Sequence, residues 1–136
     1  MKRVAKGKYD VFVNRAESLL TSMEHLAEYD LDQFASGVAV LAVHSAISFA
    51  DALFVGAKGQ RCNDQNHVEA TKELSKLCRD WNVDSAGVSH LKWLMSRKND
   101  FAYVEKRIDL NEVKLARVKA QSFASWSQRF LKALIP

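Results

Sequence analysis

Hydrophobic residues recur every three or four positions along most of the chain, which is the spacing of one face of a helix. The pattern is clear in five segments separated by short polar stretches: residues 9–29, 34–57, 66–81, 88–95 and 109–134. No bounded alternating run predicts a strand, and no Asn-Gly or Asp-Gly pair predicts a hairpin. The sequence therefore predicts an all-α fold, an up-and-down bundle of about five helices.

Polar capping residues precede several of these segments. An acceptor side chain followed three positions later by Glu or Gln occurs at Asp30–Gln33, Asn66–Glu69 and Asp109–Glu112. Asp84 or Ser85 is the expected cap of the fourth helix, and the second helix is expected to end between Gly56 and Gly59. These signals predict where the helices begin and end.

Residues 34–57 form the most apolar segment and are long enough to span a bilayer. Four polar residues interrupt the segment, namely His44, Ser45, Ser48 and Asp51. A carboxylate at the centre of a membrane span is costly. We therefore interpret the segment as the central helix of the bundle, covered on most sides by the other helices.

Length and composition indicate one soluble domain. The chain has 136 residues, 48% of them hydrophobic and 26% charged, which is enough to bury a core without disulfides or metals. Two cysteines and no apolar signal segment after the basic N-terminus favour a reduced, cytoplasmic setting. Residues 1–8 are expected to form a flexible basic tail. A net charge of +4 is compatible with an anionic partner but does not require one.

A dense polar cluster follows the fourth apolar stripe. Arg97, Asn99, Asp100 and Tyr103 would lie within about two turns if residues 88–103 form one helix. One interpretation is a solvated helix end with an ordinary Arg97–Asp100 pair. The alternative is a site for a phosphate or a base, because arginine binds phosphate bidentately and aromatic rings stack on bases.

Three stretches together resemble the HEPN superfamily of small helical-bundle domains, over roughly residues 9–134. They are the apolar helix HSAISFADALFVGAKGQR, the helix start NHVEATKELSKL, and RKNDFAYVEKRIDLNEV before the final helix. The resemblance implies a HEPN-like bundle that forms a homodimer. Many members of the superfamily are metal-independent endoribonucleases with an Arg, four to six variable residues and a His.

Arg97 matches the arginine of that nuclease motif, but residues 102–104 read Ala-Tyr-Val, so the histidine is missing. Tyr103 has too high an ordinary pKa to act as a general base near neutral pH. Arg61 and His67 have the required spacing, although they lie in the loop before the third helix, where the family does not place its motif. The chain thus resembles the branch that keeps the bundle and lacks the nuclease histidine.

Asp51 and Ser48 on the apolar helix are further candidate site residues, because a buried carboxylate such as Asp51 needs a partner. Asp51 could lie near the exposed helix end, neutralised by solvent or Lys58. Alternatively, Asp51 and Ser48 could face Arg97 across the bundle and orient it, as a polar residue on the second helix does in the family. His44 is expected to be a hydrogen-bonded core histidine.

Other site types find little support. The four histidines have no HxxxH or HExxH spacing, so no metal is expected, and no phosphate loop or other cofactor motif is present. The three tryptophans, Trp81, Trp93 and Trp126, are expected in the core or at an interface. The last helix is basic, through Lys114, Arg117, Lys119, Arg129 and Lys132. Such a run is either a solvated face or a surface for RNA.

These observations lead to one functional expectation with two alternatives. We expect a HEPN-like nucleotide- or RNA-binding module without efficient catalysis, with Arg97, Asn99, Asp100, Tyr103, Asp51 and Ser48 as ligand-binding residues. The resemblance also implies a toxin–antitoxin-like role with a small nucleotidyltransferase as partner. The alternatives are an endoribonuclease that uses Arg97 with Tyr103 or a distant histidine, and a pure protein-interaction domain.

Overall fold

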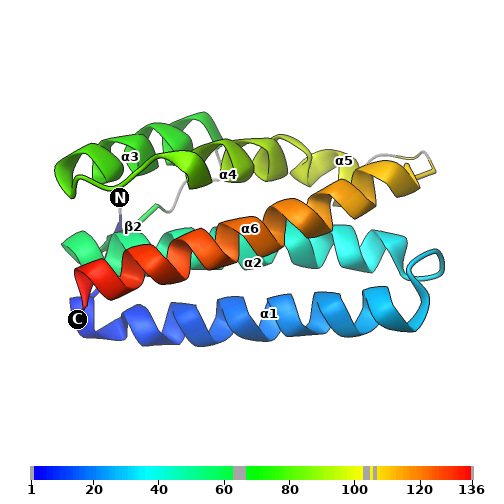
Figure 1. The fold of residues 1–136 in the computed structure, drawn as a ribbon, viewed down its shortest axis with the longest axis horizontal. Coiled ribbons are helices and arrows are strands. Elements are labelled where there is room, and N and C mark those ends of the chain that lie inside the picture. Colours follow the sequence, from blue (N-terminus) through cyan, green and yellow to red (C-terminus); the bar gives the residue numbers. More distant parts are fainter. Residues whose placement is uncertain (1, 63–66, 103–104, 106, 136) are drawn as a thin grey trace.

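The computed structural model describes residues 2–62, 67–102, 105 and 107–135 of the chain, and in them the all-α bundle is confirmed (Figure 1). The helices are α1 Tyr9–Asp30, α2 Ala35–Lys58, α3 His67–Asp80, α4 Ala86–Ser96, α5 Lys98–Ala102 and α6 Leu110–Leu134. Each of the five predicted segments corresponds to one long helix. The additional short helix α5 follows α4 directly.

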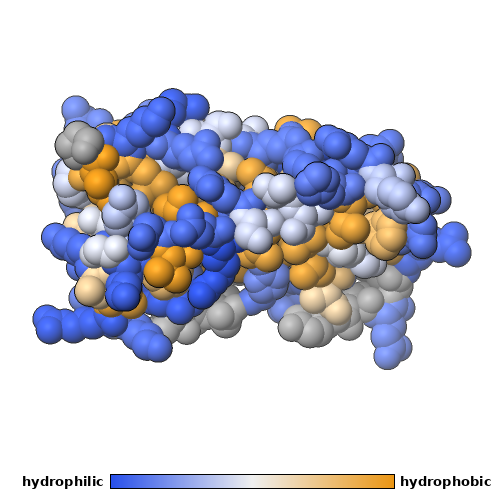
Figure 2. Space-filling view, turned by 90° about the horizontal axis from the view of Figure 1, so that it is seen from below, coloured by the Kyte–Doolittle hydropathy of each residue, from blue (hydrophilic) through white to orange (hydrophobic). Residues whose placement is uncertain are grey.

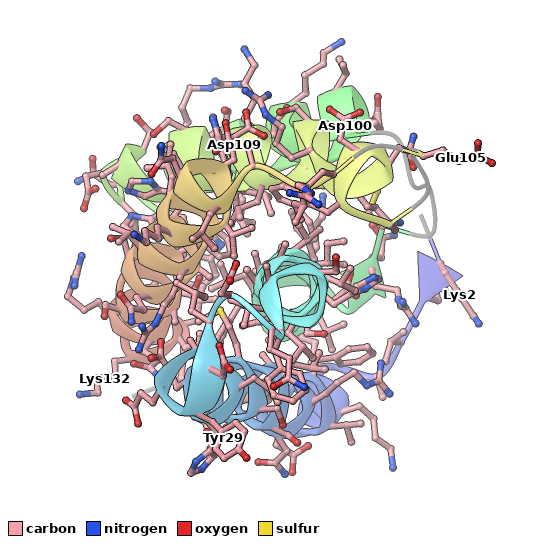
Figure 3. The ribbon with its side chains drawn as sticks, turned by 90° about the vertical axis from the view of Figure 1, so that its right-hand side faces the viewer. Lys2, Tyr29, Asp100, Glu105, Asp109 and Lys132 are labelled. Atoms are coloured by element: carbon pink, nitrogen blue, oxygen red, sulfur yellow. The ribbon has the colours of Figure 1, made fainter. Side chains whose placement is uncertain are left out.

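Helix α2 lies at the centre of the bundle, as a view along the long axis shows (Figure 3). It packs most extensively against α1 and α6, and it also contacts α4, α5 and α3. Its phenylalanines Phe49 and Phe54 are buried completely or almost completely. By length and hydropathy α2 could cross a membrane, but 78% of its apolar 18-residue stretch is buried inside the protein. This is consistent with the core helix of a soluble bundle.

The N-terminal residues are not a free tail, contrary to expectation. Strand β1, Lys2–Arg3, pairs antiparallel with strand β2, Gln60–Arg61, directly after α2. The backbone N–H of Val4 donates to the carbonyl of Gly59 at 2.8 Å. Gly59 caps α2 with φ of 64°, a left-handed conformation that favours glycine. Neither strand was predicted from the sequence, because each has only two residues, too few for an alternating pattern.

The predicted caps are confirmed in part. Asp109 accepts a hydrogen bond from the backbone N–H of Asn111 at 2.8 Å at the start of α6. At the start of α4 the acceptor is Asp84, which bonds the backbone N–H of Ala86 at 3.1 Å, while Ser85 makes no side-chain cap. Asp30 accepts a hydrogen bond from the backbone N–H of Gln33 at 3.1 Å, as predicted, but it is the last residue of α1, and α2 begins only at Ala35. Asn66 lies outside the described residues.

The surface offers no single extensive apolar face on the side of α1, where hydrophobic and hydrophilic residues are interspersed (Figure 2). The exposed large hydrophobic residues among those described are spread over α1, α3, α6 and the turn after α3: Val11, Tyr29, Val68, Trp81, Leu115 and Val118. Leu115 and Val118 lie one turn apart on α6. The homodimer stays a prediction.

Candidate functional site

Arg97 lies at the junction between α4 and α5, so residues 88–103 do not form one continuous helix. Its backbone N–H donates to the carbonyl of Leu94 at 3.2 Å, and its own carbonyl accepts from Phe101 at 3.0 Å. Helix α4 therefore ends at Ser96, and the short helix α5 begins at Lys98. The junction places the Arg97 side chain beside α6 rather than beside Asp100.

The guanidinium of Arg97 is held by neighbours on two helices. Its Nε lies 3.4 Å from Oε1 of Glu112 on α6, and one Nη donates to Oγ of Ser96 at 3.1 Å. The group also lies 4.8 Å from the centre of the Trp93 ring. About one third of the Arg97 side chain stays exposed. The expected pair with Asp100 is wrong, since the acidic partner is Glu112 across the helix interface.

The half-buried ring of Trp93 holds a second cation as well. Nζ of Lys119, on α6, lies 5.5 Å from the centre of the same ring. Among the described residues, no carboxylate lies within ion-pair distance of Lys119. An aromatic face attracts cations through its quadrupole. Arg97 and Lys119 therefore both lie beside the Trp93 ring, and among the described residues Glu112 is the one carboxylate within ion-pair distance of either cation.

A polar groove lies further along the same pair of helices. It has a volume of about 350 Å³ and is lined by His90 and Gly87 of α4 and by Ser122, Ser125 and Arg129 of α6, among others. Burial, and then the charge of Lys119, lowers the pKa of His90. Its Nδ1 is buried and finds no hydrogen-bond partner among the described residues. We use the name α4/α6 groove for this pocket together with the surface of the two helices that runs from it past Lys119 and Trp93 to Arg97.

The structure divides the basic residues of α6 into two groups. Arg117 faces α1, where its Nε donates to Glu24 at 2.9 Å and Glu28 lies nearby. This ion pair raises the pKa of Arg117. Lys119 and Arg129 instead face α4, at the ring of Trp93 and in the groove. Only the second group is available to a ligand of the α4/α6 groove.

The other residues predicted around Arg97 are exposed or lie outside the description. Asn99 and Asp100 are exposed on α5, and Asp100 is at the outer surface of the bundle (Figure 3). Tyr103 lies outside the described residues. His44 is exposed on α2, so the expected core histidine is wrong. Partial desolvation, and then the charge of Lys98, lowers the pKa of His44.

Asp51 belongs to a second, separate cluster. It is 4% exposed, and its Oδ2 lies 3.4 Å from a guanidinium nitrogen of Arg61 on β2. Both expectations for its partner are therefore wrong, since Lys58 pairs with Glu73 at 3.1 Å and no ion pair joins Asp51 to Arg97. A buried carboxylate needs a charged partner, and Asp51 has one in Arg61.

Burial raises the pKa of Asp51 to about 6, although the charges of Arg61 and then Arg15 oppose the change. Both guanidinium groups lie 5.3 Å from the ring of Phe12. The cluster borders a small cavity of about 30 Å³, enough for about one water molecule. The cluster thus joins β2 to the core and leaves little room for a ligand.

Ser48 is buried on α2, and among the described residues no hydrogen bond joins it to Arg97. Arg61, which has the spacing of the nuclease motif to His67, forms an ion pair with Asp51. It therefore belongs to the Asp51 cluster. His67 begins α3, and its side chain lies outside the described residues. No group of three potential metal ligands occurs in the part of the chain that is described.

Two features of the site were not assigned to it by sequence reasoning, namely Trp93 and His90. Both lie on one face of α4 with Arg97, at spacings of four and seven residues. This helical spacing could have assigned Trp93 and His90 to the site from the sequence. The contribution of Lys119 and Arg129 depended on how α6 is rotated against α4. No protein-family model matches the chain, and no curated protein matches it significantly.

Proposed function

We propose that this chain is a HEPN-like, cytoplasmic nucleotide- or RNA-binding module without efficient catalysis. The observation that carries the proposal is the pair of cations, Arg97 and Lys119, over the ring of Trp93. A phosphate at Arg97 would replace its 3.4 Å contact with Glu112 and its hydrogen bond to Ser96, with Lys119 as a second cation beside the same ring. Arginine offers a phosphate two parallel donors, which adds geometric specificity.

Binding is favoured over catalysis by the groups around Arg97. Cleavage of RNA needs a group that accepts a proton near neutral pH. Glu112, the carboxylate beside Arg97, is already held in an ion pair with it. Asp51 lies in the other cluster. We therefore expect the module to bind a phosphate group of RNA without cleaving the phosphodiester bond.

A metal-independent endoribonuclease is the second candidate, and one observation favours it. His90 precedes Arg97 by seven residues on the same face of α4. Its lowered pKa keeps the imidazole neutral at pH 7, the form that accepts a proton. Cleavage of labelled RNA in EDTA that is lost in both His90→Ala and Arg97→Ala would establish this activity in place of simple binding.

Arg97→Ala is expected to weaken binding of a labelled single-stranded RNA about tenfold and to reduce its salt dependence by about one counterion. The reason is the loss of one phosphate contact at the Trp93 ring. The measurement is fluorescence anisotropy at several salt concentrations. Arg79→Ala, which removes an exposed arginine on α3, serves as the matched control and should bind like the wild type.

Equal affinities of Arg97→Ala and the control would contradict the proposed site. If the wild type binds neither RNA nor nucleotides, the module role itself fails. Stable co-purification with a small nucleotidyltransferase would then favour the interaction domain, and sedimentation of the purified chain would test the homodimer.

A further inference from the structure

We infer that the ligand is a single-stranded RNA that follows the α4/α6 groove from Arg97 to Arg129, rather than a mononucleotide at Arg97 alone. This inference rests on the proposed function and specifies its ligand. It is carried by the second polar end of the groove, which lies away from Arg97 and which the binding of one phosphate would not use.

The far end of the groove has the composition of a site for a phosphate and a ribose. Arg129 supplies a charge, and Ser122 and Ser125 supply hydroxyl groups that both donate and accept hydrogen bonds. None of the residues that line the pocket at this end is acidic, although the Asp84 carboxylate lies 3.3 Å from the indole nitrogen of Trp126, one of the lining residues. Among the described residues, Arg129 has no carboxylate within ion-pair distance. An anion is the ligand that matches this charge distribution.

The two ends are too far apart for one nucleotide. Glu112 marks the level of Arg97 on α6, and Arg129 follows it on the same helix. At the rise of an α-helix, the separation along α6 is about 25 Å. Lys119 lies between the two ends, at the Trp93 ring. Three cations spaced along one groove suit a polymer with a phosphate at every residue.

A single strand fits this arrangement better than a duplex. The pocket at the Arg129 end has a volume of about 350 Å³, which admits part of a flexible strand but not a double helix. Non-specific binding of single strands typically combines a positively charged groove with aromatic side chains. Hydroxyl and imidazole groups along the path can also bond the 2′-hydroxyl of RNA.

The test compares two variants on two ligands. Arg129→Ala is expected to weaken binding of a labelled single-stranded RNA of about ten nucleotides by about fivefold. It should leave the binding of a labelled mononucleotide unchanged, whereas Arg97→Ala weakens both. Lys132→Ala is the matched control, since Lys132 projects outward beside α1 (Figure 3). Ser125→Asp, which adds a negative charge to an exposed groove position, should weaken RNA binding in the same way.

The outcomes separate this inference from the proposed function. If Arg97→Ala weakens binding while Arg129→Ala and Ser125→Asp do not, the strand path is wrong and the phosphate site stands. Equal affinity for a duplex of the same length would overturn the preference for a single strand. If Arg97→Ala has no effect on either ligand, the proposed site fails as well.

Discussion

Replacement of Arg61 with methionine is expected to lower the free energy of unfolding by about 3 kcal/mol near pH 8. The substitution keeps an apolar stem beside Phe12 but removes the cation 3.4 Å from Asp51. Asp51 is then a buried carboxylate with only the more remote charge of Arg15 to balance it. Urea unfolding followed by circular dichroism measures the loss.

Asp51→Asn is expected to behave in the opposite way. Folding raises the pKa of Asp51 to about 6, so the folded protein binds more protons than the unfolded chain between about pH 4 and about pH 6. The contribution of Asp51 to the free energy of unfolding therefore falls as the pH rises through this interval, by at most about 3 kcal/mol. The asparagine variant does not lose this stability.

The pair of variants thus makes a pH-resolved test. Near pH 4 the wild type and Asp51→Asn should be about equally stable, and near pH 8 the variant should be at least as stable as the wild type. Adding Asp51→Asn to Arg61→Met should recover most of the lost stability, because no buried charge remains. A strong loss of stability in Asp51→Asn at pH 8 would show that the ion pair is net stabilising.

Gly87→Ala is expected to destabilise the protein by about 2 kcal/mol. A Cβ at this position would lie 2.2 Å from two ring atoms of Trp126. The ring cannot move away easily, since it stacks on Phe123, meets Phe130 edge-on and donates its N–H to the carbonyl of Asp84 at 3.2 Å. Helix α4 would have to shift from α6, which would also alter the α4/α6 groove.

Gly37→Ala is the control for the glycine substitution. Gly37 also lies in a helix, α2, but the nearest atom to its added Cβ is a leucine methyl group at 3.6 Å, an ordinary contact. Alanine there should stabilise the protein by about 0.5–1 kcal/mol, the usual preference over glycine in a helix. Thermal unfolding of both variants measures the difference, and equal stabilities would mean that α4 and α6 can separate without cost.

The helices could be predicted from the sequence because their apolar faces are long and regular. The apolar character of α2 predicted its central place, and Asp109 predicted the start of α6. The break at Arg97 could not be predicted, since residues 88–102 read as helix on both sides of it. The pairing of β1 with β2 depends on backbone hydrogen bonds. Strands of two residues are too short to produce an alternating pattern of hydrophobic and polar residues.

The candidate site was predictable only where its residues share one helix. Arg97 was identified by its residue type and context, and its neighbours Trp93 and His90 follow at helical spacing. The partners Glu112 and Lys119 come from α6, and the rotation of one helix against another is decided by packing. The same reason explains Asp51, whose partner Arg61 lies on a strand that the sequence did not predict.

Binding at the α4/α6 groove can be measured by titrating the isotopically labelled protein with single-stranded RNA and following its amide chemical shifts. The largest shifts are expected on the groove faces of α4 and α6, from His90 to Arg97 and from Lys119 to Arg129. They should fade as salt is added, because the contacts are to phosphates. Shifts confined to α1 and α3, with these two faces unchanged, would contradict the α4/α6 groove as the binding site.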